Sequence, residues 1–246
     1  MDVRAYLSRI QVDPESKIVT EPTLEALREL HQQHLYAVPF ENLDIHFGVP
    51  IVLDLDRILG KVVSGRRGGF CYELNGAFAW LLSELGYDVT MLSAEVARAN
   101  GGYGIPFDHM TLRVDIDGTP WLADVGFGDN FLHPVPIDDQ LAGEYRLTSD
   151  GEIWTLAHGD VAKYRFTLTP RRLEDYVAAC HYQQTSEEST FTQRVVTTRA
   201  TPGGRITLTR ERLIRYRAGE KTETPIDDDC EWRRALEKHF GIHLEN

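Results

Sequence analysis

The spacing of apolar residues changes at Gly86, and this change limits the folds that the 246-residue chain can adopt. Before Gly86 the apolar residues recur with the period of an α-helix, first over residues 22–35 and then from Cys71 onward. Pro22 suits the first turn of the earlier helix, and Gly86 suits the position just after the end of the later one. The apolar stripe of the later helix consists of Cys71, Leu74, Ala77, Phe78, Leu81, Leu82 and Leu85. The first third of the chain is therefore predicted to be helical, and Cys71 is predicted to open a buried helix.

Short runs in which apolar and polar residues alternate follow Gly86, separated by Gly, Asp and Pro residues, and such runs are typical of antiparallel strands. Strands are expected at residues 89–97, 110–116, 121–125, 145–148, 153–156 and 164–168. Residues 170–183 return to helical spacing, strands are expected again at 191–198 and 206–208, and a last helix at 228–240. Helices, then strands, then a mixed tail indicate an α+β fold with a central sheet or small barrel.

Composition excludes several classes of protein. The 42% hydrophobic content supports a packed core, and 38 acidic against 26 basic residues oppose non-specific binding to nucleic acid. No stretch approaches the roughly 20 apolar residues that cross a bilayer, and the amino end lacks the apolar core of a signal peptide, so a cytoplasmic protein without membrane contact is expected. The cysteine and histidine spacings predict neither a disulfide nor a bound metal, and Cys180 and Cys230 are expected to be packing residues. No oligomeric state is predicted.

Basic residues are concentrated in one segment, residues 194–221, which holds eight of them against two acidic residues. The basic residues are Arg194, Arg199, Arg205, Arg210, Arg212, Arg215, Arg217 and Lys221. One interpretation is a pair of strands with a solvated arginine face. The other is a binding site for a phosphorylated small molecule, because guanidinium groups match phosphate oxygens.

Cys71 has neighbours that would lower the pKa of its thiol. It is expected at a helix N-terminus, where backbone N–H groups lack partners, and Arg66 and Arg67 lie just before it. Gly68 and Gly69 would let a substrate approach the backbone there. The alternative is a small buried core residue, as for most isolated cysteines, and the sequence around Cys71 leaves both interpretations open.

A register argument brings His109 and Asp124 together. Asp117-Gly118 is a strong signal for a two-residue hairpin turn, and with that turn Thr111 faces Asp124. His109 then lies on the same face as Asp124 and within side-chain reach on the diagonal. A three-residue loop would instead turn Asp124 to the opposite face. Taken singly, each of these two residues also fits a purely structural role.

The three residues together fit the roles of a thiol triad. A nucleophilic cysteine needs a base to take its proton, and the base needs a third group to hold its tautomer. Cys71, His109 and Asp124 match these roles in that order. The backbone N–H of Cys71 would help to bind the oxyanion of a tetrahedral intermediate. Acyl transfer is the reaction class that this arrangement predicts.

Four motifs resemble those of the arylamine N-acetyltransferase family. They are Val38-Pro39-Phe40-Glu41-Asn42-Leu43, Arg67-Gly68-Gly69-Phe70-Cys71-Tyr72-Glu73-Leu74-Asn75, Asp108-His109 and Asp124-Val125-Gly126-Phe127-Gly128, and the likeness extends to Phe240-Gly241-Ile242. The resemblance implies a helical domain at 1–86, a β-barrel domain at 87–185, an α/β lid at 186–246 and a cysteine-protease-like Cys-His-Asp core. It also implies transfer of acetyl from acetyl-CoA, with no tightly bound cofactor, to an arylamine or hydrazine through an acetyl-cysteine intermediate.

The same resemblance implies further site residues. Phe40, Phe127 and Val96 would form walls around the thiol, and Gly126 and Gly128 would let the pantetheine arm of CoA pass close to the backbone. Independently, the glycines on both sides of Phe127 leave its ring as the only bulk on a turn, which suits a pocket wall. In the basic segment, Arg210 is the candidate for a CoA phosphate. Glu41 is expected to be a local hydrogen-bonding anchor.

Three other functions stay open at this point. A papain-like or transglutaminase-like thiol hydrolase shares the triad chemistry, although the chain lacks the Cys-Gly-Ser-Cys-Trp neighbourhood of papain-like enzymes. A related amide synthase would use a different acyl donor. A binding module without catalysis would use the aromatic pocket and the basic segment to hold a nucleotide-like ligand.

Overall fold

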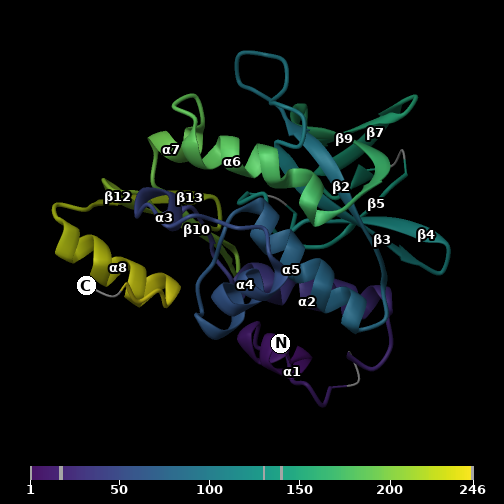
Figure 1. Ribbon diagram of the computed structural model, residues 1–246, viewed down its shortest axis with the longest axis horizontal. Coiled ribbons are helices and arrows are strands. Elements are labelled where there is room, and N and C mark those ends of the chain that lie inside the picture. The colour runs from purple at the N-terminus through teal and green to yellow at the C-terminus, as the bar shows by residue number, and fades with distance from the viewer. Residues whose placement is uncertain (1, 17–18, 130, 139–140, 245–246) are drawn as a thin grey trace.

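The computed structural model describes residues 2–16, 19–129, 131–138 and 141–244, and it has the α+β architecture expected from the sequence. Figure 1 shows the large sheet on the right, a smaller sheet with helix α8 on the left, and helices α2 and α5 between them. The helical elements are α1 (Val3–Arg9), α2 (Leu24–Ala37), α3 (Leu43–His46), α4 (Leu55–Leu59), the π-helix η2 (Gly60–Ser64), α5 (Cys71–Glu84), the 3₁₀ helix η3 (Leu173–Tyr176), α6 (Val177–Thr185), α7 (Thr190–Gln193) and α8 (Asp229–Phe240).

Helix α5 is the central helix, and its predicted bounds are confirmed. It begins at Cys71, where the N–H of Phe70 donates to Glu73 Oε2 at 3.2 Å, and it ends before Gly86, whose φ is +87°. Helix α2 begins at Leu24, two residues after Pro22, which was expected in its first turn. Thr23 is the N-cap, and its Oγ1 accepts from the N–H of Ala26 at 3.2 Å.

The large sheet has the order β5-β4-β3-β2-β9-β8-β7-β6, and every neighbouring pair is antiparallel. Its strands are β2 (Asp88–Val96), β3 (His109–Ile116), β4 (Thr119–Ala123), β5 (Val135–Pro136), β6 (Leu141–Ala142), β7 (Tyr145–Asp150), β8 (Ile153–His158) and β9 (Val161–Arg171). The two edge strands, β5 and β6, follow each other closely in the chain, so the sheet curls into a nearly closed barrel.

The hairpin of β3 and β4 has the register that the sequence predicted. Asp117 and Gly118 both have positive φ, +50° and +78°, as a two-residue type I′ turn requires. Leu112 faces Ala123, so the residue after β4 is Asp124, on the face of Thr111. The alternative three-residue loop is therefore wrong.

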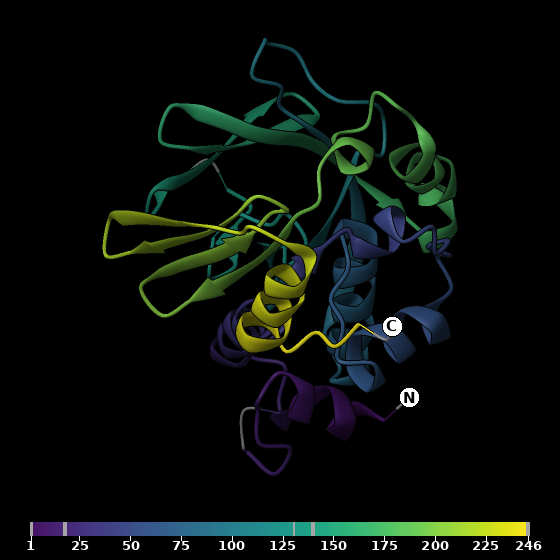
Figure 2. The ribbon, with the colours of Figure 1, turned by 90° about the vertical axis from the view of Figure 1, so that its left-hand side faces the viewer.

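The smaller sheet joins the amino-terminal part of the chain to the carboxyl-terminal part. Its order is β1-β10-β11-β12-β13, with β1 (Phe40–Glu41), β10 (Thr197–Thr201), β11 (Gly204–Leu208), β12 (Arg212–Arg217) and β13 (Glu220–Pro225). Helix α8 packs its apolar face on this sheet through Trp232, Leu236 and Phe240. In Figure 2 the strands of the smaller sheet extend to the same side of the molecule as the large sheet. The domain boundaries expected after residues 86 and 185 stay a prediction. The pairing of β1 with β10 crosses both of them.

Two predictions in the carboxyl-terminal part are wrong. The strand expected at 191–198 begins only at Thr197, because Ser189 Oγ accepts from the N–H of Phe191 at 3.2 Å and Thr192 Oγ1 donates to Ser186 O at 2.7 Å. These local side-chain hydrogen bonds stabilise the helical turn α7 instead of extended backbone. Cys230 is exposed on α8 rather than packed, whereas Cys180 is buried.

Arg9 connects three segments around the start of α5. Its side chain is buried and donates to the carbonyl oxygens of Val62, Ala37, Arg66 and Arg67 at 3.0, 2.8, 3.3 and 3.3 Å. Ala37 ends α2, where helix carbonyls carry partial negative charge. Burial lowers the pKa of Arg9 to about 10, so the guanidinium stays charged at neutral pH.

Replacing Arg9 with Met is expected to reduce the free energy of unfolding by about 3 kcal/mol or more, because several buried carbonyls lose their donor. Urea unfolding measures the change. The matched control is Arg4→Met on the same helix: Arg4 pairs with Glu15 at the surface, and such pairs contribute under about 1 kcal/mol. Equal losses for the two variants would show that Arg9 is not a structural anchor.

Two buried histidines lie on the inner face of α2. His31 Nδ1 bonds the carbonyl oxygen of Leu132 at 2.9 Å, and its ring stacks on Phe131; His34 Nε2 bonds the hydroxyl of Tyr6 at 3.1 Å. Burial lowers the pKa of His31 to about 4 and the pKa of His34 well below its usual value. Both rings are therefore neutral in the folded protein at neutral pH.

This neutrality predicts a loss of stability in mild acid. The unfolded chain protonates these rings below about pH 6.5 whereas the folded chain does not, so the stabilisation is present above pH 6.5 and is lost as pH falls toward 4. For His31 the expected loss is about 2 kcal/mol between pH 7 and pH 5. Urea unfolding at pH 7 and pH 5 measures this loss of unfolding free energy. The loss should be smaller for His31→Gln than for the original protein. It should be the same as in the original protein for His243→Gln, because the ring of His243 is exposed. A His31→Gln difference as large as the original would contradict the prediction.

Candidate active site

Cys71 lies at the start of α5, buried beneath the chain that leaves β4. Only 3% of the residue is exposed, and the backbone of Met110 in β3 hydrogen-bonds the thiol. A Cβ atom on Gly126 would lie 2.8 Å from Cys71 Cα and 2.7 Å from Asn75 Nδ2, so glycine is needed for this close approach. The turn after β4 therefore packs directly on the first turn of α5.

The register of the β3–β4 hairpin places His109 and Asp124 in contact. His109 Nε2 lies 2.7 Å from Asp124 Oδ2, and both residues are buried. The diagonal placement that the Asp117-Gly118 turn predicted is confirmed by this contact. Because Nε2 is bonded to the carboxylate, Nδ1 is the ring atom left for proton exchange with a substrate or a nucleophile.

In the described part of the chain, at least four hydrogen-bond donors surround the Asp124 carboxylate. Oδ1 accepts from Asn75 Nδ2 and from the N–H of Gly126, both at 2.9 Å, and Oδ2 accepts from His109 and from the hydroxyl of Tyr164 at 2.9 Å. Burial raises the pKa of Asp124, but His109 and these hydrogen bonds outweigh it, so the pKa lies below its usual value. The carboxylate is thus kept ionised in the interior.

Sequence reasoning missed three residues of this network. Asn75 lies one helical turn after Cys71, a spacing that puts both on one face and could have pointed to it. Tyr164 reaches Asp124 from β9, and His31 Nε2 accepts from the N–H of Asp124 at 3.1 Å from α2. No local signal marks Tyr164 or His31, because only the folded sheet and helix bring them to Asp124.

The expectation that Arg66 and Arg67 lower the pKa of the thiol is wrong. Burial raises the pKa of Cys71 well above its usual value, the carboxylates of Asp108 and Asp124 add to this, and the Met110 backbone only partly opposes it. Arg67 instead pairs with Glu41 and Asp44, each at 2.8 Å. The thiol therefore needs a proton acceptor beside it to become a thiolate.

The ion pairs of Arg67 belong to a buried cluster next to α5. Lys61 pairs with Asp44 at 2.7 Å and with Glu73 at 2.8 Å, and burial raises the pKa of Glu73 to about 7. Glu41 Oε2 also accepts from the N–H of Leu43 at 2.7 Å, which confirms its expected role as a local anchor. The cluster ties β1, α3 and η2 to the first turn of α5.

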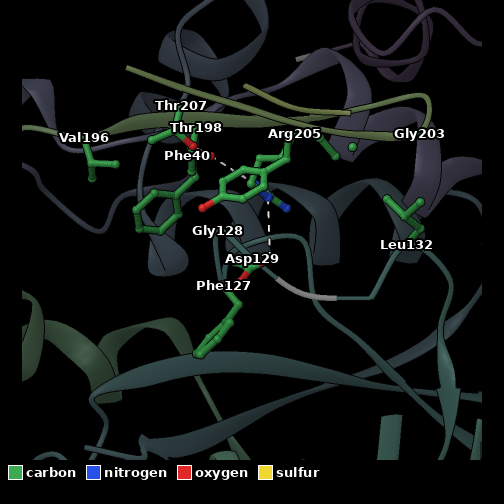
Figure 3. Close-up of a pocket in the computed structure, with 13 residues that line it drawn as sticks. Phe40, Phe127, Gly128, Asp129, Leu132, Val196, Thr198, Gly203, Arg205 and Thr207 are labelled. Atoms are coloured by element: carbon green, nitrogen blue, oxygen red, sulfur yellow. Dashed lines mark hydrogen bonds and ion pairs between the residues drawn. The ribbon is translucent and has the colours of Figure 1, made fainter. Parts of the chain in front are cut away.

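A cavity of about 850 Å³ opens beside the turn after β4. It is lined by Phe40, Phe127, Gly128, Asp129, Leu132, Val196, Thr198, Ala200, Gly203, Gly204, Arg205, Thr207 and Tyr216. Figure 3 shows Arg205 between Thr198 and Asp129, with Phe40 and Phe127 also on the cavity. The ring of Phe127 lies edge-on to the ring of His109, with centroids 5.2 Å apart. Phe127 thus lines the cavity and also contacts His109 of the His109–Asp124 pair.

Of the other predicted binding residues, only Gly128 lines the cavity of Phe40 and Phe127. Val96 lines a second cavity of about 600 Å³, together with Asp108 and Gln183, and not the cavity of Phe40 and Phe127. Gly128 lines the first cavity, whereas Gly126 is packed against Cys71. Arg210 does not line either cavity: it pairs with Asp229 at 2.8 Å and lies over the ring of Trp232, 3.8 Å from the centroid.

The described residues contain no group of three or more His, Cys, Asp or Glu side chains arranged to hold a metal ion. Within the same part of the chain, no helix has the length and apolar character needed to span a membrane.

The amino-acid sequence is similar to a known protein family and to characterised members of it. The model of a family described as N-acetyltransferase matches residues 23–246. The arylamine N-acetyltransferase / N-hydroxyarylamine O-acetyltransferase of Salmonella typhimurium is 34% identical over 99% of this chain and 90% of that protein, and the arylamine N-acetyltransferase of Escherichia coli is 33% identical over 91% and 84%.

Solved structures show the same likeness in three dimensions. The Salmonella typhimurium arylamine N-acetyltransferase structure superposes with a TM-score of 0.92 at 32% identity and covers 99% of this chain and 92% of that one. The Mycobacterium marinum arylamine N-acetyltransferase in complex with CoA gives 0.88 at 30% identity, with 98% and 93% covered. Because the family model, the sequences and the folds agree over nearly the whole length, this chain belongs to the arylamine N-acetyltransferase family.

Proposed function

We propose that this protein transfers the acetyl group of acetyl-CoA to the nitrogen of an aromatic amine or hydrazine through an acetyl-cysteine at Cys71. The observation that carries the proposal is the buried pair of His109, in β3, and Asp124, in the turn after β4. The backbone of β3 at Met110 and the turn at Gly126 both contact Cys71 at the start of α5. Family membership and the CoA complex of the Mycobacterium marinum relative support acetyl-CoA as the donor.

The first half of the reaction forms the acetyl-enzyme. The thiol proton passes to His109 Nδ1, the sulfur attacks the thioester carbonyl carbon, and the CoA thiolate leaves with the proton from His109. Because burial raises the pKa of Cys71, the thiolate forms only as the partner of an imidazolium, and Asp124 stabilises that cation. The N–H of Cys71, at the first position of α5, has no acceptor inside the helix and is our candidate donor to the oxyanion.

The second half returns the enzyme to its starting state. A neutral amine attacks the acetyl carbonyl, His109 takes the proton from the amine nitrogen, and the sulfur leaves and recovers a proton from His109. Water would hydrolyse the thioester, so the site must be shielded. Cys71 and His109 are both nearly fully buried, and the ring of Phe127, which lines the cavity, packs edge-on against the ring of His109.

Intact-mass measurement after incubation with acetyl-CoA alone tests the covalent step. We expect the added mass of one acetyl group, located on Cys71 by peptide mapping and lost when an arylamine is added. Cys71→Ala should stay unlabelled, whereas Cys180→Ala should still be labelled, because Cys180 lies in α6 and its thiol bonds Gln184. Peptide cleavage without labelling would indicate a thiol hydrolase, and labelling only by other acyl donors would indicate an amide synthase.

Steady-state kinetics test the His109–Asp124 pair. Asp124→Asn should lower kcat by roughly 10⁴, the effect that the same change has in a serine triad. Tyr164→Phe removes one donor to the carboxylate and should lower kcat roughly tenfold or more. The control is Tyr87→Phe, whose hydroxyl bonds the carbonyl oxygen of Thr23 far from the pair. Full activity of Asp124→Asn would exclude the proposed role of Asp124.

The expected cytoplasmic location and the acceptor walls at Phe40 and Phe127 are parts of the same proposal. The two phenyl rings on the cavity offer flat surfaces on which an aromatic acceptor can stack.

A further inference from the structure

Glu73 bonds the backbone directly before the nucleophile. It lies two residues after Cys71 in α5, its side chain is 3% exposed, and its Oε2 accepts from the N–H of Phe70 at 3.2 Å. A Cβ atom on Gly69 would lie 2.6 Å from the same oxygen, so the carboxylate packs on this turn of the backbone. The carbonyl oxygen of Phe70 accepts from the N–H groups of Glu73 and Leu74, both at 3.0 Å. Because the peptide group between Phe70 and Cys71 is planar, these bonds fix the direction of the Cys71 N–H.

The buried cluster that contains Glu73 has more carboxylates than cations. In the described part of the chain, Glu41, Asp44 and Glu73 lie with Lys61 and Arg67, and none of these five side chains is more than 19% exposed. A buried charge without a partner is unfavourable. One of the three carboxylates is therefore expected to take up a proton.

Glu73 is the carboxylate that takes this proton most readily. Among the described residues its one ion pair is with Lys61, at 2.8 Å, and Lys61 also pairs with Asp44 at 2.7 Å. Asp44 has Arg67 as a second cation, at 2.8 Å. Burial raises the pKa of Glu73 to about 7 against the opposing effect of Lys61, and Glu41 and Asp44 add to the rise. At Asp44 burial also raises the pKa, but the two cations outweigh it, so the pKa lies below its usual value.

A proton on Glu73 weakens its bond to Phe70. A carboxylate accepts an N–H hydrogen bond roughly twice as strongly as a neutral group does, and its charge is favourable at a helix N-terminus. The proton also removes the charge with which Lys61 pairs. Cys180 of α6 lies near Glu73 as well, but burial raises the pKa of its thiol to about 12, so this neighbour stays neutral.

We propose that Glu73 is a positioning residue for Cys71: its ionised carboxylate fixes the peptide group between Phe70 and Cys71, and protonation of Glu73 slows the acylation of Cys71. The inference rests on the proposed function. The tetrahedral intermediate needs the Cys71 N–H at its oxyanion, so a less firmly fixed peptide group lowers the rate. Glu73 itself exchanges no proton with the substrate.

The test compares the original protein with Glu73→Gln across pH, because glutamine keeps an oxygen for the Phe70 N–H but has no charge to titrate. Single-turnover acylation by acetyl-CoA is measured from pH 6 to pH 8. The two rate constants should be nearly equal at pH 6, and the original protein should be roughly threefold or more faster at pH 8. This ratio should change with a midpoint near pH 7. The titration of His109 occurs in both proteins and therefore cancels in the ratio.

Two further variants sharpen the comparison. The matched control is Glu84→Gln, an exposed glutamate at the other end of α5, which should acylate like the original protein at every pH. Asp44→Asn gives the cluster equal numbers of carboxylates and cations, so its acylation profile should shift to lower pH by roughly one unit or more. Asp44→Asn leaves Glu73 in place, so an unshifted profile counts against the inference even if Glu73→Gln does not fold.

Failure of the inference and failure of the proposed function give different results. If acetyl-CoA acylates Cys71 but the ratio for Glu73→Gln is the same at every pH, Glu73 is only structural, and the inference fails while the proposed function stands. If acetyl-CoA does not acylate the original protein, the proposed function fails. Amide hydrogen exchange over residues 70–74 then decides the inference: the original protein should be better protected than Glu73→Gln at pH 8 but not at pH 6, and equal protection at both would overturn it.

Discussion

The carboxylate of Asp124 is a negative charge in the interior, and the surrounding structure depends on compensating it. Among the described residues, donors from α5, β3, β9 and the turn after β4 bond the carboxylate, and His31 of helix α2 bonds its backbone. A buried charge is tolerated only when its hydrogen-bonding positions are filled. The contacts that satisfy Asp124 therefore also fix the first turn of α5 against the sheet, so folding and the positioning of His109 have the same physical cause.

Three arginines differ in the partners that compensate their charge. Arg67 is held by nearby carboxylates, and Arg9 by carbonyl oxygens at the ends of helices and turns; both connect elements around Cys71. Arg205 is largely buried in the wall of a cavity, and the nearest carboxylate in the described part of the chain is that of Asp129, at 3.6 Å and exposed. The two cations with filled hydrogen-bonding positions stabilise the fold around the start of α5.

Local patterns predicted the elements that carry the site. The apolar stripe and Gly86 gave the bounds of α5, and Asp117-Gly118 gave the register that joins His109 to Asp124, because these features depend on neighbours in the sequence. The expectation that failed required knowledge of distant partners: Arg67 was expected to act on Cys71, but Glu41 and Asp44 bind it. Arg210 lies over Trp232 and pairs with Asp229, and its contact with a CoA phosphate stays a prediction.

The sequence by itself determined the change from helices to antiparallel strands, the bounds of α5, the hairpin register and the three residues of the proposed triad, since periodicity and turn chemistry act over a few residues. Only the tertiary structure decided the protonation of the site. The high pKa of the thiol, the ionised Asp124 and the neutral His31 all follow from burial and from partners on other elements, and both arise when the chain is folded.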